Sequence, residues 1–487
     1  MCNKPGPSLT AKGFFDTLFP LAVHLSVALP ILLMKPDICP LYFQGGNPLI
    51  KLSRNEASLR LCRLGMLVYT FWLMLPAVQS TGRAITGILC SGLFVLGLIL
   101  DFEEWRMHWK LLTAQAAAAI AMPLILFFFL DRGAGSLPGF FARNLMLWLP
   151  LIFVSYAKRK ADPRLWKGLK LMTLATMGIT TLTTIGWLIQ GLFVENLWHT
   201  YPRMLGSGLT DGETLKGLMR RNIGGYDFIY AAVLTLPLLC GGIQHSKGWK
   251  RAGLLFFLLL EVIMIVMSEY TYAIVYTAVI LLVEFTGLII RRLFKLSLGK
   301  SLLAGLIPLA ILFLLRIPLI RFASDLFGSL GMASVGANLE KLLQMLEGVT
   351  VSDGNRLVHY QEAWAGFTAS PFIGSILSPE KRLSQHSELL DLLSGVGLLG
   401  TLAVGGLLFL LHRGAWNGTK KSASFPHLVL MGLTLVVIAS LGTAFYSREM
   451  FVVYAAGLLF FSAQAEDVTP SAGPGEGSSG TLPSTTE

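Results

Sequence analysis

Residues 252–290 read AGLLFFLLLEVIMIVMSEYTYAIVYTAVILLVEFTGLII, with Lys250 and Arg251 directly before them and Arg291 and Arg292 directly after. The run contains no basic residue, and each of its halves approaches the ~20 apolar residues that an α-helix needs to cross a hydrocarbon core. We therefore predict two membrane-spanning helices, at 252–268 and 271–290, with their basic flanks on the same side of the membrane.

The composition of the whole chain agrees with this local pattern. Of its 487 residues, 54% are hydrophobic and only 14% are charged, and its mean hydropathy is +0.64. Soluble domains carry roughly a quarter charged residues. The composition therefore excludes a soluble enzyme.

Apolar segments of similar length recur along the chain, about thirteen in all. We predict them at residues 14–34, 61–78, 84–100, 109–130, 144–157, 168–189, 226–244, 252–268, 271–290, 300–320, 388–411, 427–445 and 449–463. The first is expected to be retained, since no A-x-A-like cleavage site follows it. The expected fold is an all-α, polytopic membrane protein with about 12–13 transmembrane helices. One membrane domain takes up residues 1–463, and the Gly-, Pro-, Ser- and Thr-rich stretch 464–487 is expected to be a disordered tail.

Charged residues predict the topology. The net charge of +11 arises largely from loops at 158–170, 245–251, 291–300 and 412–426, which carry one acid, Asp162. Basic loops belong on the cytoplasmic side, so the charge does not indicate a nucleic-acid partner. The two long loops, 191–225 and 321–387, then lie outside and are where we expect the active site. Alternation puts the N-terminus outside, whereas Lys4 and Lys12 favour the inside, and this point stays open.

The five cysteines give no sign of a disulfide framework or a zinc site. Cys2, Cys39, Cys62, Cys90 and Cys240 are scattered and form no C-x-x-C pair.

The strongest functional signal lies just after the second outer loop. His386-Ser387 is followed, after nine residues, by Gly397-Leu-Leu-Gly400-Thr401. This pattern resembles the signature of the superfamily of O-antigen ligases and O-antigen polymerases, in which His and a small polar residue precede Gly-x-x-Gly-Thr at the same spacing. Two further stretches are similar to family motifs. They are Gly354-Asn355-Arg356 with Tyr360, Ala363, Pro371 and Gly374, and Arg220-Arg221-Asn222-Ile223-Gly224-Gly225, which directly precedes a membrane segment.

The resemblance implies a GT-C-like, metal-independent membrane glycosyltransferase of the bacterial cytoplasmic membrane, without a cofactor, in polysaccharide biosynthesis for the cell envelope. Its donor would be a glycan linked to undecaprenyl diphosphate, and its acceptor a lipid, a glycan or a protein on the outer face. The implied catalytic residue is His386. Arg220, Arg221 and Arg356 are the candidates that hold the donor diphosphate.

Side-chain chemistry makes these roles plausible independently. Guanidinium groups stay charged and make bidentate bonds to phosphate oxygens, which suits a leaving diphosphate. A histidine, with an ordinary pKa of about 6.5, can accept a proton from an acceptor hydroxyl or bond the phosphate as imidazolium. His386 could do either.

Three alternatives remain beside the ligase, which the motif around His386 favours. The chain could be a polymerase that joins lipid-linked repeat units. It could also be a transporter or flippase, in which Glu261, Glu284 and Asp391 line a pathway. Such acids are costly inside a membrane, and we expect Glu261 in particular to face the bundle interior. Finally, Asp211 and Glu213 could hold a divalent cation, although no further acid is spaced to complete that site.

Overall fold

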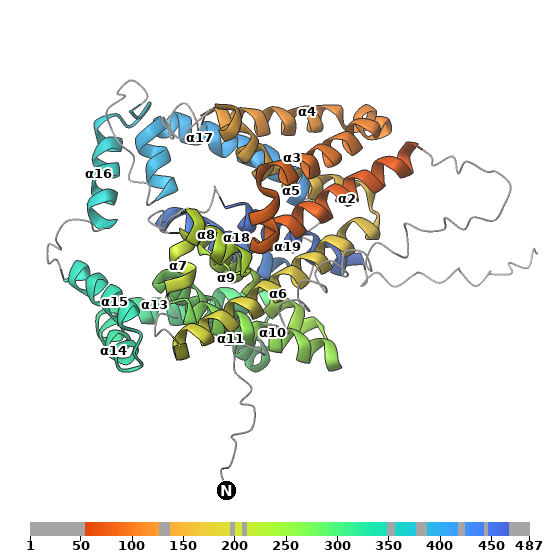
Figure 1. The fold of residues 1–487 in the computed structure, drawn as a ribbon. Helices are drawn as coiled ribbons and strands as arrows, with labels where there is room; N and C mark the ends of the chain where they lie inside the picture. The colour runs from red at the N-terminus through yellow and green to blue at the C-terminus, as the bar shows by residue number, and fades with distance from the viewer. Residues whose placement is uncertain are drawn as a thin grey trace, which may run out of the picture.

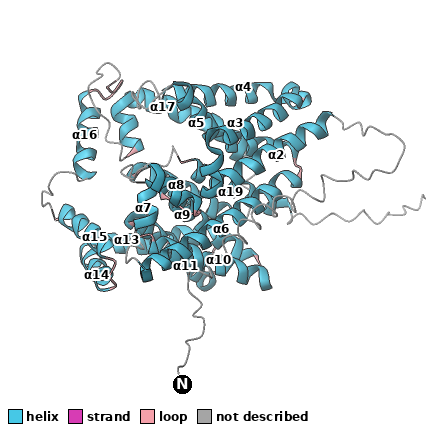
Figure 2. Cartoon of the chain, in the orientation of Figure 1, coloured by secondary structure: helices cyan, strands magenta, loops and turns pink. Residues whose placement is uncertain are grey.

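The computed structural model describes residues 54–125, 137–194, 200–206, 212–347, 356–375, 387–416, 424–442 and 447–466. Within these ranges the chain is helical and contains no strand (Figures 1 and 2). The predicted first span at 14–34 and residues 467–487 of the predicted tail lie outside the described residues, whereas residues 464–466 belong to the last helix.

The helices follow one another with short connections. They are α2 (Arg54–Met74), α3 (Pro76–Leu100), α4 (Phe102–Ile125), α5 (Leu137–Lys160), α6 (Pro163–Val194), α7 (Thr200–Gly206), α8 (Gly212–Arg220), α9 (Tyr226–His245), α10 (Gly248–Met267), α11 (Thr271–Phe294), α12 (Leu298–Ala304), α13 (Ile307–Leu314), α14 (Arg316–Ser329), α15 (Ala333–Leu346), α16 (Arg356–Ala369), α17 (Glu388–Trp416), α18 (Phe425–Leu441) and α19 (Arg448–Glu466).

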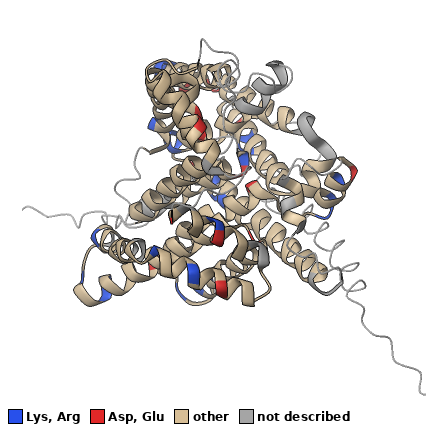
Figure 3. Ribbon diagram, turned by 90° about the vertical axis from the view of Figure 1, so that its left-hand side faces the viewer, with Lys and Arg blue, Asp and Glu red and all other residues tan. Residues whose placement is uncertain are grey.

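Four of the described helices are long and apolar enough to cross a membrane, over residues 164–191, 226–245, 271–294 and 388–416. Charged side chains occupy few positions along the ribbon (Figure 3). Large apolar side chains such as Phe256, Phe285 and Phe409 are more than 60% exposed on these and neighbouring helices. Apolar surface of this extent is typical of helices that face lipid. The chain is therefore an all-α protein with the character of a membrane protein, and the total of 12–13 spans stays a prediction.

Helix α9 forms the centre of the bundle. Its side chains are buried on every face from Phe228 to Leu239. A helix that is hydrophobic all round is buried among other helices. Helices α10, α11, α18 and α19 all pack against α9, so the start of α9 has a fixed position at one end of the bundle.

The close pair α2 and α3 depends on two glycines. A Cβ atom at Gly65 would lie 2.7 Å from the backbone nitrogen of Phe94, and one at Gly97 would lie 2.6 Å from the Cys62 sulfur. Small residues let membrane helices approach this closely. Pro76 begins α3 directly after Leu75, so the predicted loop between spans 61–78 and 84–100 is replaced by a single residue between two helices.

The predicted span at 300–320 is wrong as one continuous helix. The chain there forms α12, α13 and the beginning of α14, with breaks at Gly305-Leu306 and at Leu315. Pro308 and Pro318 stand at the second position of α13 and the third of α14, where a missing N–H costs least. Hydrophobicity alone does not distinguish one long helix from two short ones that restart at prolines.

Both long outer loops contain helices. Residues 191–225 include the end of α6, then α7 and α8, and residues 321–387 include most of α14, then α15 and α16. In Figure 1, α14, α15 and α16 lie at one side of the main bundle. Arg356 is therefore the first residue of a helix, whereas the sequence placed it within a long polar loop.

The membrane-embedded acids face inward. Glu261 is fully buried and accepts a hydrogen bond of 3.0 Å from Thr181 on α6, which confirms its predicted orientation. Glu284 is 4% exposed and lies 2.7 Å from Nδ1 of His427 on α18. Asp391 is 8% exposed. Glu261 and Glu284 thus each have a partner on a different helix, as expected for structural polar contacts in a membrane.

The predicted cytoplasmic loops meet at one end of the bundle. Lys158 bonds the carbonyl of Ala415, and Nδ1 of His245 lies 3.4 Å from the Ser424 hydroxyl. The predicted loop at 158–170 is largely helical, because α5 extends to Lys160 and α6 begins at Pro163.

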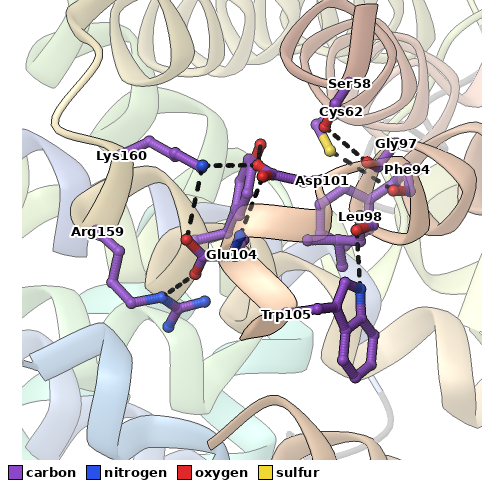
Figure 4. Close-up of polar contacts among 11 residues, drawn as sticks. Ser58, Cys62, Phe94, Gly97, Leu98, Asp101, Glu104, Trp105, Arg159 and Lys160 are labelled. Carbon is purple, nitrogen blue, oxygen red and sulfur yellow. Dashed lines mark hydrogen bonds and ion pairs between the residues drawn. The ribbon is translucent and has the colours of Figure 1, made fainter. Parts of the chain in front are cut away.

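Two of the basic residues counted in that loop are buried in ion pairs (Figure 4). Lys160 lies 2.8 Å from Asp101 and 3.7 Å from Glu104, and Arg159 pairs with Glu104. Tyr156 donates a hydrogen bond of 2.9 Å to Asp101. Since these cations and carboxylates neutralise one another, the cluster joins α5 to the start of α4 and offers no open anion site.

Candidate functional site

The turn that carries Arg220 and Arg221 is shaped by Asn222. Helix α8 ends at Arg220, and Asn222 adopts a left-handed conformation with φ 55°. Its backbone N–H bonds the Met219 carbonyl at 2.9 Å. Asparagine tolerates this conformation better than most residues, so it is a natural residue to end a helix.

Threonines of α6 fix this turn from within the bundle. The Asn222 side-chain amide donates to the hydroxyls of Thr180 and Thr183 at 3.1 and 3.0 Å. Its oxygen accepts the Ala77 N–H at 3.2 Å, and Thr183 bonds the Asn222 carbonyl at 2.8 Å. Thr184 accepts the N–H of Gly224 at 2.8 Å. The turn before α9 is therefore held by a ladder of hydroxyl groups on a membrane helix.

Our sequence analysis did not single out these threonines. The signal was present, because residues 180–184 read TTLTT in the middle of an otherwise apolar segment. Hydroxyl groups at that depth hydrogen-bond either their own helix or a neighbour. Nothing in the sequence indicates that the neighbour is a turn about 40 residues further along the chain.

This network predicts that Asn222→Ala destabilises the protein by about 2 kcal/mol, since three interhelical hydrogen bonds and a favourable left-handed residue are lost. Asn338→Ala is the matched control, because Asn338 is exposed and bonds only the Thr271 hydroxyl, at 3.2 Å, among its printed contacts. Thermal unfolding in detergent micelles should separate the two variants. Equal melting temperatures would contradict the ladder.

The two arginines of the turn are both exposed. The Arg221 guanidinium lies over the Trp187 ring, 4.5 Å from its centroid. Stacking on an aromatic face keeps the charge while restricting the side chain. Arg220 ends α8, where a cation is favoured by the helix dipole.

The second motif folds as one unit with the third. Helix α17 is interrupted at Gly397, where φ is 66° and ψ is −173°. The N–H groups that this break releases find partners in the preceding turn, because Leu398 bonds the Pro371 carbonyl at 2.8 Å and Leu399 bonds the Phe372 carbonyl at 3.1 Å. Ser375 in return bonds the Ser394 carbonyl at 2.9 Å.

Glycines make this contact possible. Cβ atoms at Gly374 and Gly397 would each lie within 2.5 Å of the opposing backbone, and both glycines have positive φ. Thr401 closes the break by donating to the Gly397 carbonyl at 2.7 Å. Glycine and threonine of the predicted signature thus serve the backbone geometry.

Four helix ends converge around Gly442, directly after α18. The Glu388 N–H at the start of α17 bonds the Gly442 carbonyl at 3.2 Å. The Tyr360 hydroxyl of α16 bonds the neighbouring Leu441 carbonyl at 3.1 Å. A Cβ atom on Gly442 would lie 2.9 Å from the hydroxyl of Tyr226, the first residue of α9. The starts of α9 and α17 and the middle of α16 therefore lie together.

The predicted site residues are described to different degrees. Arg220 and Arg221 stand a few residues before Tyr226, at this end of the bundle. Position 356 is one turn before Tyr360 on α16, and for this arginine the structure describes the backbone alone. His386 lies outside the described residues; its neighbour Ser387 caps α17 by accepting the Leu390 N–H at 3.2 Å and donates to the Ser440 carbonyl at 2.6 Å.

Within the described residues, no group of three His, Cys, Asp or Glu side chains could share a metal ion. Of the predicted acidic pair, Asp211 lies outside those residues and Glu213 pairs with Lys216 at 2.6 Å.

Comparisons with known proteins add no family to this description. No protein family, no curated protein and no solved structure matches the chain. A function for it therefore depends on the residues and contacts described above.

Proposed function

We propose that the protein is an O-antigen ligase-like glycosyltransferase with a GT-C-like fold, anchored by multiple spans in a bacterial cytoplasmic membrane. It would transfer a glycan from undecaprenyl diphosphate to an acceptor on the outer face, as a step in polysaccharide biosynthesis for the cell envelope. The observation that carries the proposal is the convergence around Gly442. Three sequence stretches that resemble the family's motifs, from α8–α9, α16 and α17, meet there although they are up to 180 residues apart.

Charge at this end of the bundle suits a diphosphate. Arg220 and Arg221 are accessible, and Arg356 opens α16, whose first turn contains no acidic residue. The N-terminus of a helix offers unpaired N–H groups and a partial positive charge, both of which favour anions. Guanidinium groups beside such an N-terminus would stabilise the charge that grows on the departing diphosphate.

His386 is the proposed proton acceptor. It directly precedes Ser387, whose hydroxyl begins α17 at the junction with Gly442. A neutral imidazole there would take the proton from the acceptor hydroxyl as the glycosidic bond forms and the bond to the diphosphate breaks. Breaking that bond makes the transfer favourable without ATP.

The deciding experiment supplies purified protein in proteoliposomes with an oligosaccharide linked to undecaprenyl diphosphate, plus candidate lipid acceptors, without ATP and with a chelator. A new glycosidic product supports the transferase. A product made of joined repeat units, with no external acceptor consumed, identifies a polymerase. Movement of the donor lipid between leaflets with no new bond would overturn the proposal in favour of a flippase.

Arg356→Lys tests the diphosphate contact. We expect the transfer rate to fall at least about tenfold, because a bidentate contact becomes a point charge. Arg321→Lys is the matched control, since Arg321 is an exposed arginine of the same outer region that pairs with Glu347 at 2.9 Å. Transfer by the Arg356 variant at the control's rate would count against a diphosphate contact at this position.

A further inference from the structure

A cavity of about 170 Å³ lies beside the turn that carries the arginines. Its wall includes Met219 and Ile223 on either side of that turn, Tyr226 and Asp227 at the start of α9, Gln79 of α3 and Glu449 of α19. A cavity of roughly 150 Å³ is known to hold a benzene-sized molecule. The available volume is therefore that of a single six-membered ring.

Two carboxylates, from helices distant in the sequence, face this cavity. Asp227 is exposed and Glu449 is partly exposed. Ser447 hydrogen-bonds Asp227, and the Gln79 side chain hydrogen-bonds Glu449. Arg448 acts electrostatically on both carboxylates, and its guanidinium lies 5.5 Å from the centroid of the Trp72 ring. Both acids are thus held in place and keep further oxygen lone pairs for a ligand.

The composition of the wall excludes two kinds of occupant. A divalent cation would find only two carboxylates and would be repelled by Arg448, whereas such ions take six or more oxygen ligands. A diphosphate would meet two negative charges at short range. An uncharged ring with several hydroxyl groups fits the remaining chemistry, because carboxylates and the Gln79 amide accept and donate hydrogen bonds while Tyr226 and Phe228 supply apolar surface.

We propose that this cavity binds one sugar ring of the acceptor. The inference rests on the proposed function, and it assigns the neighbouring sites by charge. The arginines before α9 bind the anionic donor, and the carboxylates after them bind the neutral acceptor. A sugar of the donor is disfavoured here, since its diphosphate would be attached directly to the ring and would lie close to Asp227 or Glu449.

Binding can be tested without transfer. We would measure saturation-transfer difference NMR of the methyl glycosides of glucose, galactose and N-acetylglucosamine with the full-length protein in nanodiscs. Ring protons of at least one glycoside should be saturated by the wild type, and the signal should fall at least about fivefold in Asp227→Asn, Glu449→Gln and the double variant. Glu213→Gln is the control, because Glu213 is an exposed acid of the same region that pairs with Lys216 outside the cavity. Signals that are absent for all three glycosides, or equal in the cavity variants and the control, would overturn the sugar site.

Kinetics in the transfer assay distinguish the acceptor from the donor. The double variant should raise the acceptor KM at least about tenfold and leave the donor KM unchanged, since only one substrate loses contacts. A rise in the donor KM alone would overturn the assignment to the acceptor. NMR signals that depend on Asp227 and Glu449 in a protein without transfer activity would refute the proposed function and keep the sugar site. Transfer with an unaltered acceptor KM would refute the acceptor site and keep the function.

Discussion

His386→Ala should abolish glycan transfer while the protein remains folded. Loss of a general base costs roughly 10²–10⁴ in rate, which would bring the product below detection in most assays. The fold should survive because the contacts that begin α17 are made by Ser387 and Glu388, which the substitution leaves in place. Product formation is measured with the lipid-linked donor, and folding by size-exclusion chromatography of the purified variant.

His359→Ala is the control for that experiment. His359 is also a histidine of the outer region, on α16, and it lies 3.3 Å from the exposed Glu362. Its removal should leave the rate within about twofold of the wild type, because surface ion pairs contribute little. Near-normal transfer by the His386 variant would remove the proposed proton acceptor.

Gly397→Ala should destabilise the fold by about 3 kcal/mol or more. The backbone at this position has φ 66° and ψ −173°, a region that is essentially restricted to glycine. A Cβ atom would also lie 2.4 Å from the carbonyl carbon and oxygen of Phe372. Relief of that clash requires separating α17 from the turn after α16, with the loss of the hydrogen bonds from Leu398 and Leu399.

Gly405→Ala, eight residues later on the same helix, is the matched control. A Cβ atom there has no neighbour within 4 Å. Replacing this glycine should leave stability unchanged or raise it by up to about 1 kcal/mol through helix propensity. The yield of monodisperse protein and the midpoint of thermal unfolding measure both variants. A Gly397 variant as stable as the Gly405 variant would contradict the geometry of the break.

The sequence predicts the helical class and the position of most helices because both depend on composition and on segment length. Segments 252–268 and 271–290 correspond closely to α10 and α11. The same reasoning fails at 300–320, where prolines restart short helices within a continuous apolar run. It also misses how far helices extend into polar sequence, as α5 does through Lys160, since its last basic residues are neutralised by Asp101 and Glu104.

The candidate site was predictable in part for a different reason. A motif such as His386-Ser387 with Gly397 and Thr401 is recognisable because its spacing is local. The partners of that motif are distant, and the pairing of Leu398 with Pro371 or of Asn222 with Thr180 follows from tertiary packing. Asp227 and Glu449 are 222 positions apart, and no local pattern relates the two acids that share the cavity.

The hydroxyl ladder of α6 has a consequence for life at the cell surface. Salt in the surrounding medium screens charges within about 10 Å at moderate ionic strength, and it will weaken the attraction between an anionic lipid and exposed arginines. The bonds from Thr180, Thr183 and Thr184 to the turn are uncharged and internal, so the medium does not reach them. Changing osmolarity should therefore alter how readily a substrate arrives, and leave the place where it docks undisturbed.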